Sequence, residues 1–127
     1  MKNKQIDNEN IAADEHFVDI FKEFDLMRDN LSENTDTAFE ILKLYDNALD
    51  QESVDVLRIT CSNILDCEEL AKSILEKYES VKKQVFAGKT DSQMQQQALE
   101  LLKEIKKLEK TSSKNFKQLL ELSASIK

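Results

Sequence analysis

The chain has 127 residues, of which 34% are charged and 40% are hydrophobic, and its formal net charge is −7 at pH 7. Proline is absent and Gly88 is the only glycine, so the sequence lacks the residues that build tight turns and phosphate-binding, dinucleotide-binding or EF-hand loops. The length fits one domain, and long segments rich in Lys, Glu, Leu, Gln and Ala favour an all-α fold.

The N-terminal decapeptide, MKNKQIDNEN, carries charges but has no apolar core, and apolar runs elsewhere are short. We therefore expect neither a secretory signal nor a membrane-spanning segment, and we expect a cytoplasmic protein. Residues 1–9 are predicted to form a flexible tail. Residues 10–127 are predicted to form a single helical-bundle domain.

Two short helices are predicted next. The first begins near Asn10, a favoured N-cap residue, and its apolar residues recur at helical spacing. They are Ala13, Phe17, Ile20, Phe21, Phe24, Met27 and Leu31. The stretch LSENTDTAFE interrupts this pattern, and Thr37 with Glu40 forms a capping box for the second helix, although Ser32, Asn34 or Thr35 could cap it instead. The second helix places on one face Ala38, Ile41, Leu42, Tyr45, Ala48 and Leu49.

A long helix is predicted from about residue 52 to residue 87, with Asp50 as its cap. Its apolar stripe is out of phase with that of the preceding helix, which favours a break between them; one continuous helix is the alternative. Its seam positions alternate gaps of three and four: Leu57, Thr60, Ile64, Cys67, Ala71, Ile74, Tyr78, Val81 and Val85.

The stretch FAGKTDSQ predicts a turn between two helices, because Gly88 suits a left-handed C-terminal cap and Thr90 with Gln93 forms a capping box. The last helix has the same seam spacing: Met94, Ala98, Leu101, Ile105, Leu108, Ser112, Asn115, Leu119, Leu122 and Ile126. A hairpin about Gly88 pairs positions whose numbers sum to about 179.

This pairing predicts a polar layer inside the apolar seam, with Ser112 beside Cys67 and Asn115 beside Ile64. A polar seam residue commonly fixes the register of packed helices. The alternative is that KTSSKNF, residues 110–116, breaks the last helix.

The stripe of the last helix is wider than a two-stranded seam, because Leu102, Phe116 and Leu120 flank it. We therefore expect the two short helices to cover the long hairpin, forming an antiparallel bundle of about four helices that turns at Gly88. Partial cover would leave an apolar surface for a partner.

Six lysines share the opposite face of the last helix: Lys103, Lys106, Lys107, Lys110, Lys114 and Lys117. Such a row is typical of a solvated helix surface, and it would also suit an acidic partner.

Residues 1–71 hold 18 acidic and 6 basic side chains, whereas residues 72–127 hold 7 acidic and 12 basic ones. The two halves therefore either attract each other or meet different partners. The predicted partner-binding residues are Lys103, Lys107, Lys110, Lys114, Lys117, Leu102, Phe116 and Leu120.

No residue pattern indicates catalysis, a metal or a cofactor. Cys61 and Cys67 are six positions apart, so they cannot pair within one helix, and they do not complete a four-ligand zinc set. His16 is the only histidine, and Glu68 and Glu69 diverge around their helix.

We therefore expect a non-catalytic protein–protein interaction module, an adaptor or chaperone-like acidic bundle. The alternative is a self-associating structural subunit of a larger assembly. Nucleic acid is not an expected partner because the chain is acidic and its basic half has no arginine. A membrane surface is not expected either, because the lysine-bearing helix needs its apolar face for the bundle.

Overall fold

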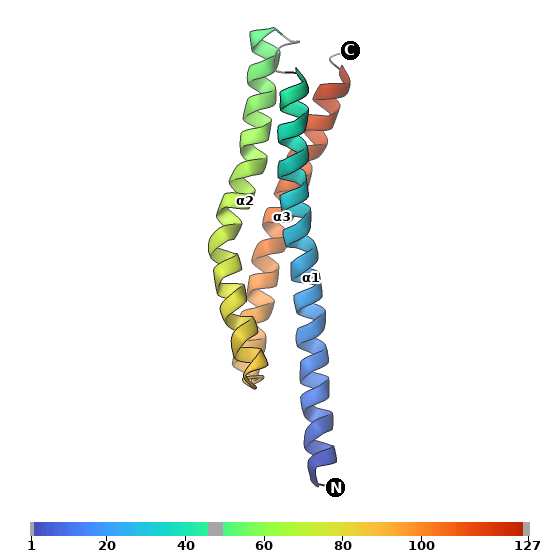
Figure 1. Ribbon diagram of the computed structural model, residues 1–127, viewed down its shortest axis with the longest axis vertical. Helices are drawn as coiled ribbons and strands as arrows, with labels where there is room; N and C mark the ends of the chain where they lie inside the picture. Colours follow the sequence, from blue (N-terminus) through green and yellow to red (C-terminus); the bar gives the residue numbers. More distant parts are fainter. Residues whose placement is uncertain (1, 46–49, 126–127) are drawn as a thin grey trace.

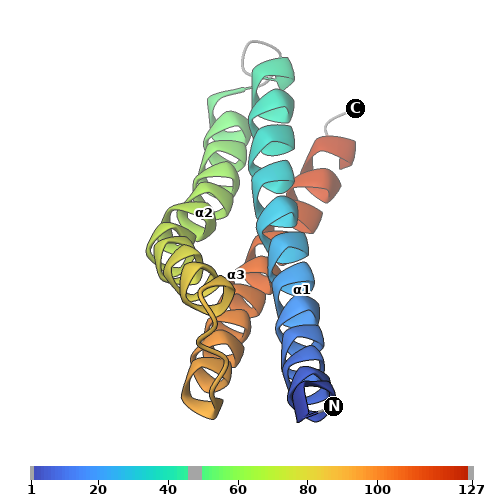
Figure 2. The same ribbon diagram turned by 60° about the horizontal axis from the view of Figure 1, so that its bottom comes forward.

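The computed structural model describes residues 2–45 and 50–125. Within these ranges the chain is all-helical, with α1 at Lys2–Tyr45, α2 at Gln51–Phe86 and α3 at Ser92–Ser125, and it has no strand. Each helix contacts the other two. The helices run up, down and up, and the N-terminal end of α1 projects beyond the turn that joins α2 to α3 (Figure 1). Figure 2 shows α3 crossing α1 near the middle of the bundle.

The prediction of about four helices was wrong for the described residues, because α1 continues through the stretch expected to separate two short helices. Two polar side chains there find partners without ending the helix. The Thr35 hydroxyl donates to the carbonyl of Leu31, 3.0 Å away, and the Asn34 amide donates to Ser112 Oγ on α3, 3.1 Å away. A residue that could cap a new helix therefore stays inside an existing one.

At the start of the chain, the backbone of residues 2–9 belongs to α1. A flexible tail at residues 1–9 stays a prediction.

The predicted boundary before the long helix is present. Asp50 caps α2, and its Oδ1 accepts a hydrogen bond of 2.8 Å from the Ser53 amide. The predicted seam residues Ala48 and Leu49 lie outside the described residues.

The connection from α2 to α3 contains Gly88 at φ 99°, a backbone conformation that disfavours any side chain. The Gly88 amide donates to the carbonyl of Val85, and the Lys89 amide donates to that of Gln84, as in a Schellman motif. The capping box predicted at Thr90 is not the cap: Asp91 Oδ1 accepts from the Met94 amide at 2.8 Å.

The seam predicted for the two long helices forms the core. All nine predicted seam residues of α2 are buried. On α3, six predicted positions are buried and three are half-buried, while Ile126 lies outside the described residues. The Asn63 amide donates to Asn115 Oδ1 across the two helices at 3.4 Å, joining positions that sum to 178, close to the expected register. The helix α3 runs unbroken through residues 110–116.

Two apolar clusters fill the bundle. The larger lies toward the turn and includes a stacked pair, Phe24 and Tyr78, whose ring centroids are 3.7 Å apart. The smaller lies toward the other end, around Leu57, Ile64 and Leu119. Asn34 and the fully buried Ser112 form a polar contact that belongs to neither cluster.

Candidate functional site

A groove of about 590 Å³ lies between α1 and α2 beside the turn, and we call it the turn groove. Its lining residues come from two turns of α1, one turn of α2 and the connection: Phe17, Val18, Phe21, Lys22, Asp25, Lys82, Val85, Phe86, Gly88 and Thr90. The buried lining residues Phe17, Phe21 and Val85 form an aromatic and aliphatic floor, and the polar lining residues are half-buried or exposed. Grooves of this composition are typical of binding sites.

The turn groove exposes an aromatic side chain. Phe86 is 76% exposed, the highest value among the large hydrophobic residues that the structure describes, and Val18 on the facing helix is 44% exposed. The Phe86 ring packs edge-on against buried Phe21, with centroids 6.3 Å apart. The groove therefore continues the hydrophobic core out to the surface, which is the usual character of a contact surface for a partner.

A hydrogen-bonded network supports one wall of the groove. The buried Tyr78 hydroxyl donates to Asp25 Oδ1 at 2.9 Å and lies 3.1 Å from the Phe21 carbonyl. The Arg28 guanidinium lies 3.4 Å from the same Asp25 oxygen. Burial, followed by the contact with Asp25, raises the pKa of Tyr78 far above its ordinary value, so this hydroxyl stays protonated and donates at neutral pH.

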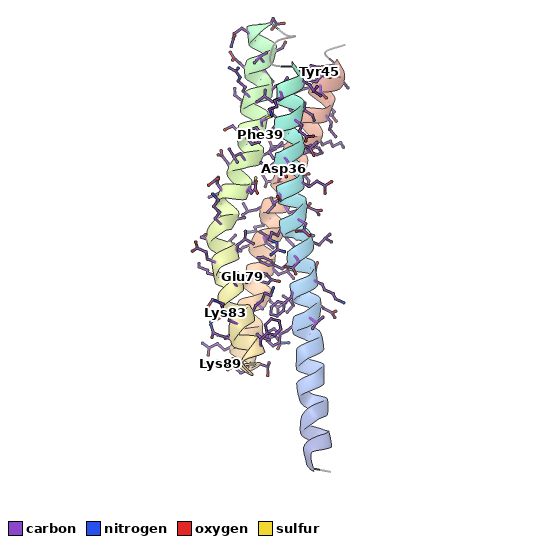
Figure 3. All side chains as sticks on the ribbon, in the orientation of Figure 1. Asp36, Phe39, Tyr45, Glu79, Lys83 and Lys89 are labelled. Atoms are coloured by element: carbon purple, nitrogen blue, oxygen red, sulfur yellow. The ribbon has the colours of Figure 1, made fainter. Side chains whose placement is uncertain are left out.

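Lysines stand on both walls of the groove. Lys22 comes from α1 and Lys82 from α2, and the Lys82 ammonium lies 5.1 Å from the centroid of the Tyr78 ring. Figure 3 shows Lys89 at the turn, between the lining residues Gly88 and Thr90, and Lys83 and Glu79 on α2. The polar sides of the groove are thus mainly cationic, although the whole chain is acidic.

The lysine row predicted from the sequence lies elsewhere. All six of its lysines are exposed on α3, and Lys106 forms an ion pair with Glu23 of α1. Of the apolar residues predicted to accompany the row, Leu102 is buried in the larger cluster, Phe116 packs against the smaller one, and Leu120 is 45% exposed. Partner binding by the lysine row and by these apolar residues stays a prediction.

Sequence reasoning missed the turn groove. Phe17 and Phe21 were assigned only to the core, and Phe86 was outside the predicted seam. One signal was available: Phe86 lies between the last seam residue, Val85, and the glycine that ends the helix. A bulky apolar residue next to a seam position can reach the surface, because it points about 100° away from the seam.

Few of the described side chains have the surroundings that metal binding or thiol reactivity requires. No group of His, Cys, Asp and Glu among them could hold a metal ion. Cys61 and Cys67 are unpaired and buried, and burial raises the pKa of both thiols, which disfavours the reactive thiolate. His16 is exposed. In residues 2–45 and 50–125 we find no helix with an apolar stretch sufficient to span a bilayer.

Comparisons with protein-family models, with curated proteins and with solved structures found no match for this chain.

Proposed function

We propose that this chain is a non-catalytic protein-binding module that receives a helix of a partner protein in the turn groove. The observation that carries the proposal is the exposed Phe86 ring at the edge of an aromatic groove between two helices. Helical grooves with apolar floors commonly bind the apolar face of an amphipathic helix. The partner would supply a fourth helix to the three of the described chain.

The cellular setting belongs to the same proposal. Cys61 and Cys67 are both free thiols, which accords with a reducing compartment such as the cytoplasm. We take the partner to be a protein because the groove has an apolar floor and few polar groups.

Site-specific photocrosslinking in the cells that make the protein tests the proposal. A photoreactive phenylalanine analogue replaces Phe86 in one variant and Leu120 in a control variant. Both residues are exposed and apolar, but Leu120 lies on α3, outside the groove. We expect a crosslinked product of higher mass from position 86 and none from position 120. Equal products at both positions, or none at either, would contradict the proposal.

A second candidate function is self-association into a larger assembly. The observation that favours it lies at the end of the bundle opposite the turn, where Leu44 is 74% exposed and Phe39 borders a smaller groove of about 330 Å³. Figure 3 shows Phe39 far along α1 from the turn that carries Lys89. Sedimentation over a series of concentrations tests it: a mass that rises with concentration supports it, and a constant monomer mass removes it.

A further inference from the structure

We infer that the helix bound by the turn groove carries carboxylate side chains along both edges of its apolar stripe. This inference rests on the proposed function and specifies the chemistry of the partner.

The shape of the groove favours a helical occupant. On α1 the lining residues Phe17, Phe21 and Asp25 are each one turn apart, and on α2 Lys82 and Phe86 have the same spacing. The α1 wall from Phe17 to Asp25 is therefore about 12 Å long at 1.5 Å per residue. Two parallel rows of this kind match apolar anchors at positions i, i+3 or i+4, and i+7 of a partner helix.

We take the occupant to be a helix of another chain. The helices α1, α2 and α3 already pack against one another, and the described residues contain no further helix to fill the groove. The projecting Phe86 edge and the exposed Val18 define the two sides between which the partner's apolar stripe would lie.

The charged side chains that line the groove indicate which charge the partner helix should carry. Among the side chains that the structure describes, neither Lys22 nor Lys82 has a carboxylate within ion-pairing distance. Asp25, the acidic residue of the lining, is already held by the Tyr78 hydroxyl and the Arg28 guanidinium. Asp19 and Glu79 are exposed but do not line the groove. One ammonium group on each wall is thus left to meet a carboxylate.

Apolar contacts and charges make different contributions to binding of the partner helix. The apolar side chains at the two sides of the groove supply most of the affinity, because burial of Phe86 and Val18 removes apolar surface from water. Exposed ion pairs add little each and act mainly on selectivity and on the association rate. We therefore expect the two lysines together to favour an acidic over a basic helix by about tenfold at low ionic strength, with the preference shrinking as salt is added.

The test uses the whole chain and synthetic helical peptides with one shared Leu and Phe stripe. The residues flanking that stripe are Glu in the first peptide, Gln in the second and Lys in the third. Binding is measured by fluorescence anisotropy at low and at high salt. We expect the Glu peptide to bind most tightly and the Lys peptide most weakly. The Lys22→Ala/Lys82→Ala variant should bind all of them about equally, and Phe86→Ala should weaken binding of every peptide.

Controls keep these outcomes interpretable. A Lys103→Ala/Lys107→Ala variant removes two exposed lysines of α3, outside the groove, and should keep the preference for Glu. Helical circular dichroism checks that each variant folds, and all the altered lysines are exposed or half-buried, so the fold should survive.

Three results would overturn the inference. If the Lys peptide bound as tightly as the Glu peptide, the charge assignment would be wrong while the proposed function would stand. If no peptide bound although Phe86 crosslinked a protein in cells, the partner would not be a helix of this chemistry. If Phe86→Asp converted a dimer of this chain to a monomer, the occupant would be a second copy. Failure of both the peptides and the crosslinking would remove the proposed function as well.

Discussion

Replacing Asn34 by alanine tests the contact that distinguishes the continuous α1 from two separate helices. The Asn34 amide donates to Ser112 Oγ at 3.1 Å and to Ser113 Oγ at 3.3 Å. Each such bond contributes about 0.5–1.5 kcal/mol, and Ser112, which is fully buried, cannot regain its bond from water. Alanine favours the helix by roughly 0.5 kcal/mol over asparagine. The expected net loss of unfolding free energy is therefore about 0.5–2.5 kcal/mol.

Urea unfolding followed by helical circular dichroism gives this loss from the midpoint, provided that the slope of the transition is unchanged. The control is Ser32→Ala, an exposed position in the same stretch, which should gain a few tenths of a kcal/mol from helix propensity alone. In a double-mutant cycle, Asn34→Ala and Ser112→Ala should couple by about 0.5–1.5 kcal/mol. The contact between α1 and α3 would be refuted if the losses from Asn34→Ala and Ser112→Ala were simply additive and Asn34→Ala cost no more unfolding free energy than Ser32→Ala.

Other substitutions test the turn, the core and the network beside the groove. Gly88→Ala should lose about 1–2 kcal/mol in urea unfolding, because φ 99° is unfavourable for alanine although no atom lies within 4 Å of the added Cβ; no loss would contradict the turn. Leu102→Ala should lose about 2–5 kcal/mol and Leu120→Ala under about 1 kcal/mol, because only Leu102 is buried, and similar losses would contradict their placement. The pKa of Tyr78 is raised above 10, so the folded state keeps a proton that the unfolded state releases at higher pH. That stabilisation is complete below pH 10 and declines above it. Urea unfolding on either side of pH 10 should therefore show that the natural chain loses more unfolding free energy at alkaline pH than Tyr78→Phe does. Equal losses in the two proteins would contradict the raised pKa.

The two long helices could be predicted from the sequence because their pattern is regular. The seam of α2 keeps gaps of three and four over its whole length, and the structure buries every one of those residues. The lone glycine and the polar residues after it mark the connection to α3. Only the local cap was misassigned, because Thr90 and Asp91 are neighbours of similar capping preference.

The continuity of α1 was missed because capping residues are a local signal, whereas their partners here are distant in sequence. Thr37 and Glu40 would suit a helix start, yet Asn34 bonds to a serine 78 positions away. The spacing of the buried residues does indicate one continuous helix. Leu31, Thr35 and Ala38 are all buried, and they keep gaps of four and three across the polar stretch. Thr35 is polar and was therefore not counted in the seam, although its hydroxyl is satisfied by the Leu31 carbonyl.

The turn groove could not be predicted from periodicity, because it depends on how far each helix extends. Phe86 is on the last turn of α2, where packing against α1 is incomplete, so it is exposed although its neighbour Val85 is buried. A seam pattern identifies which side chains face inward, but it does not show where the neighbouring helix leaves them uncovered.

The most direct test of the account is an NMR measurement of ¹³Cα chemical shifts along residues 28–41. A continuous α1, which makes the chain a bundle of three helices with the turn groove uncovered, predicts helical shifts at every position, with slowed amide exchange around buried Thr35. Coil-like shifts and rapid exchange at residues 32–37 would show two helices instead of one, and would contradict both the polar contact and the arrangement built on it.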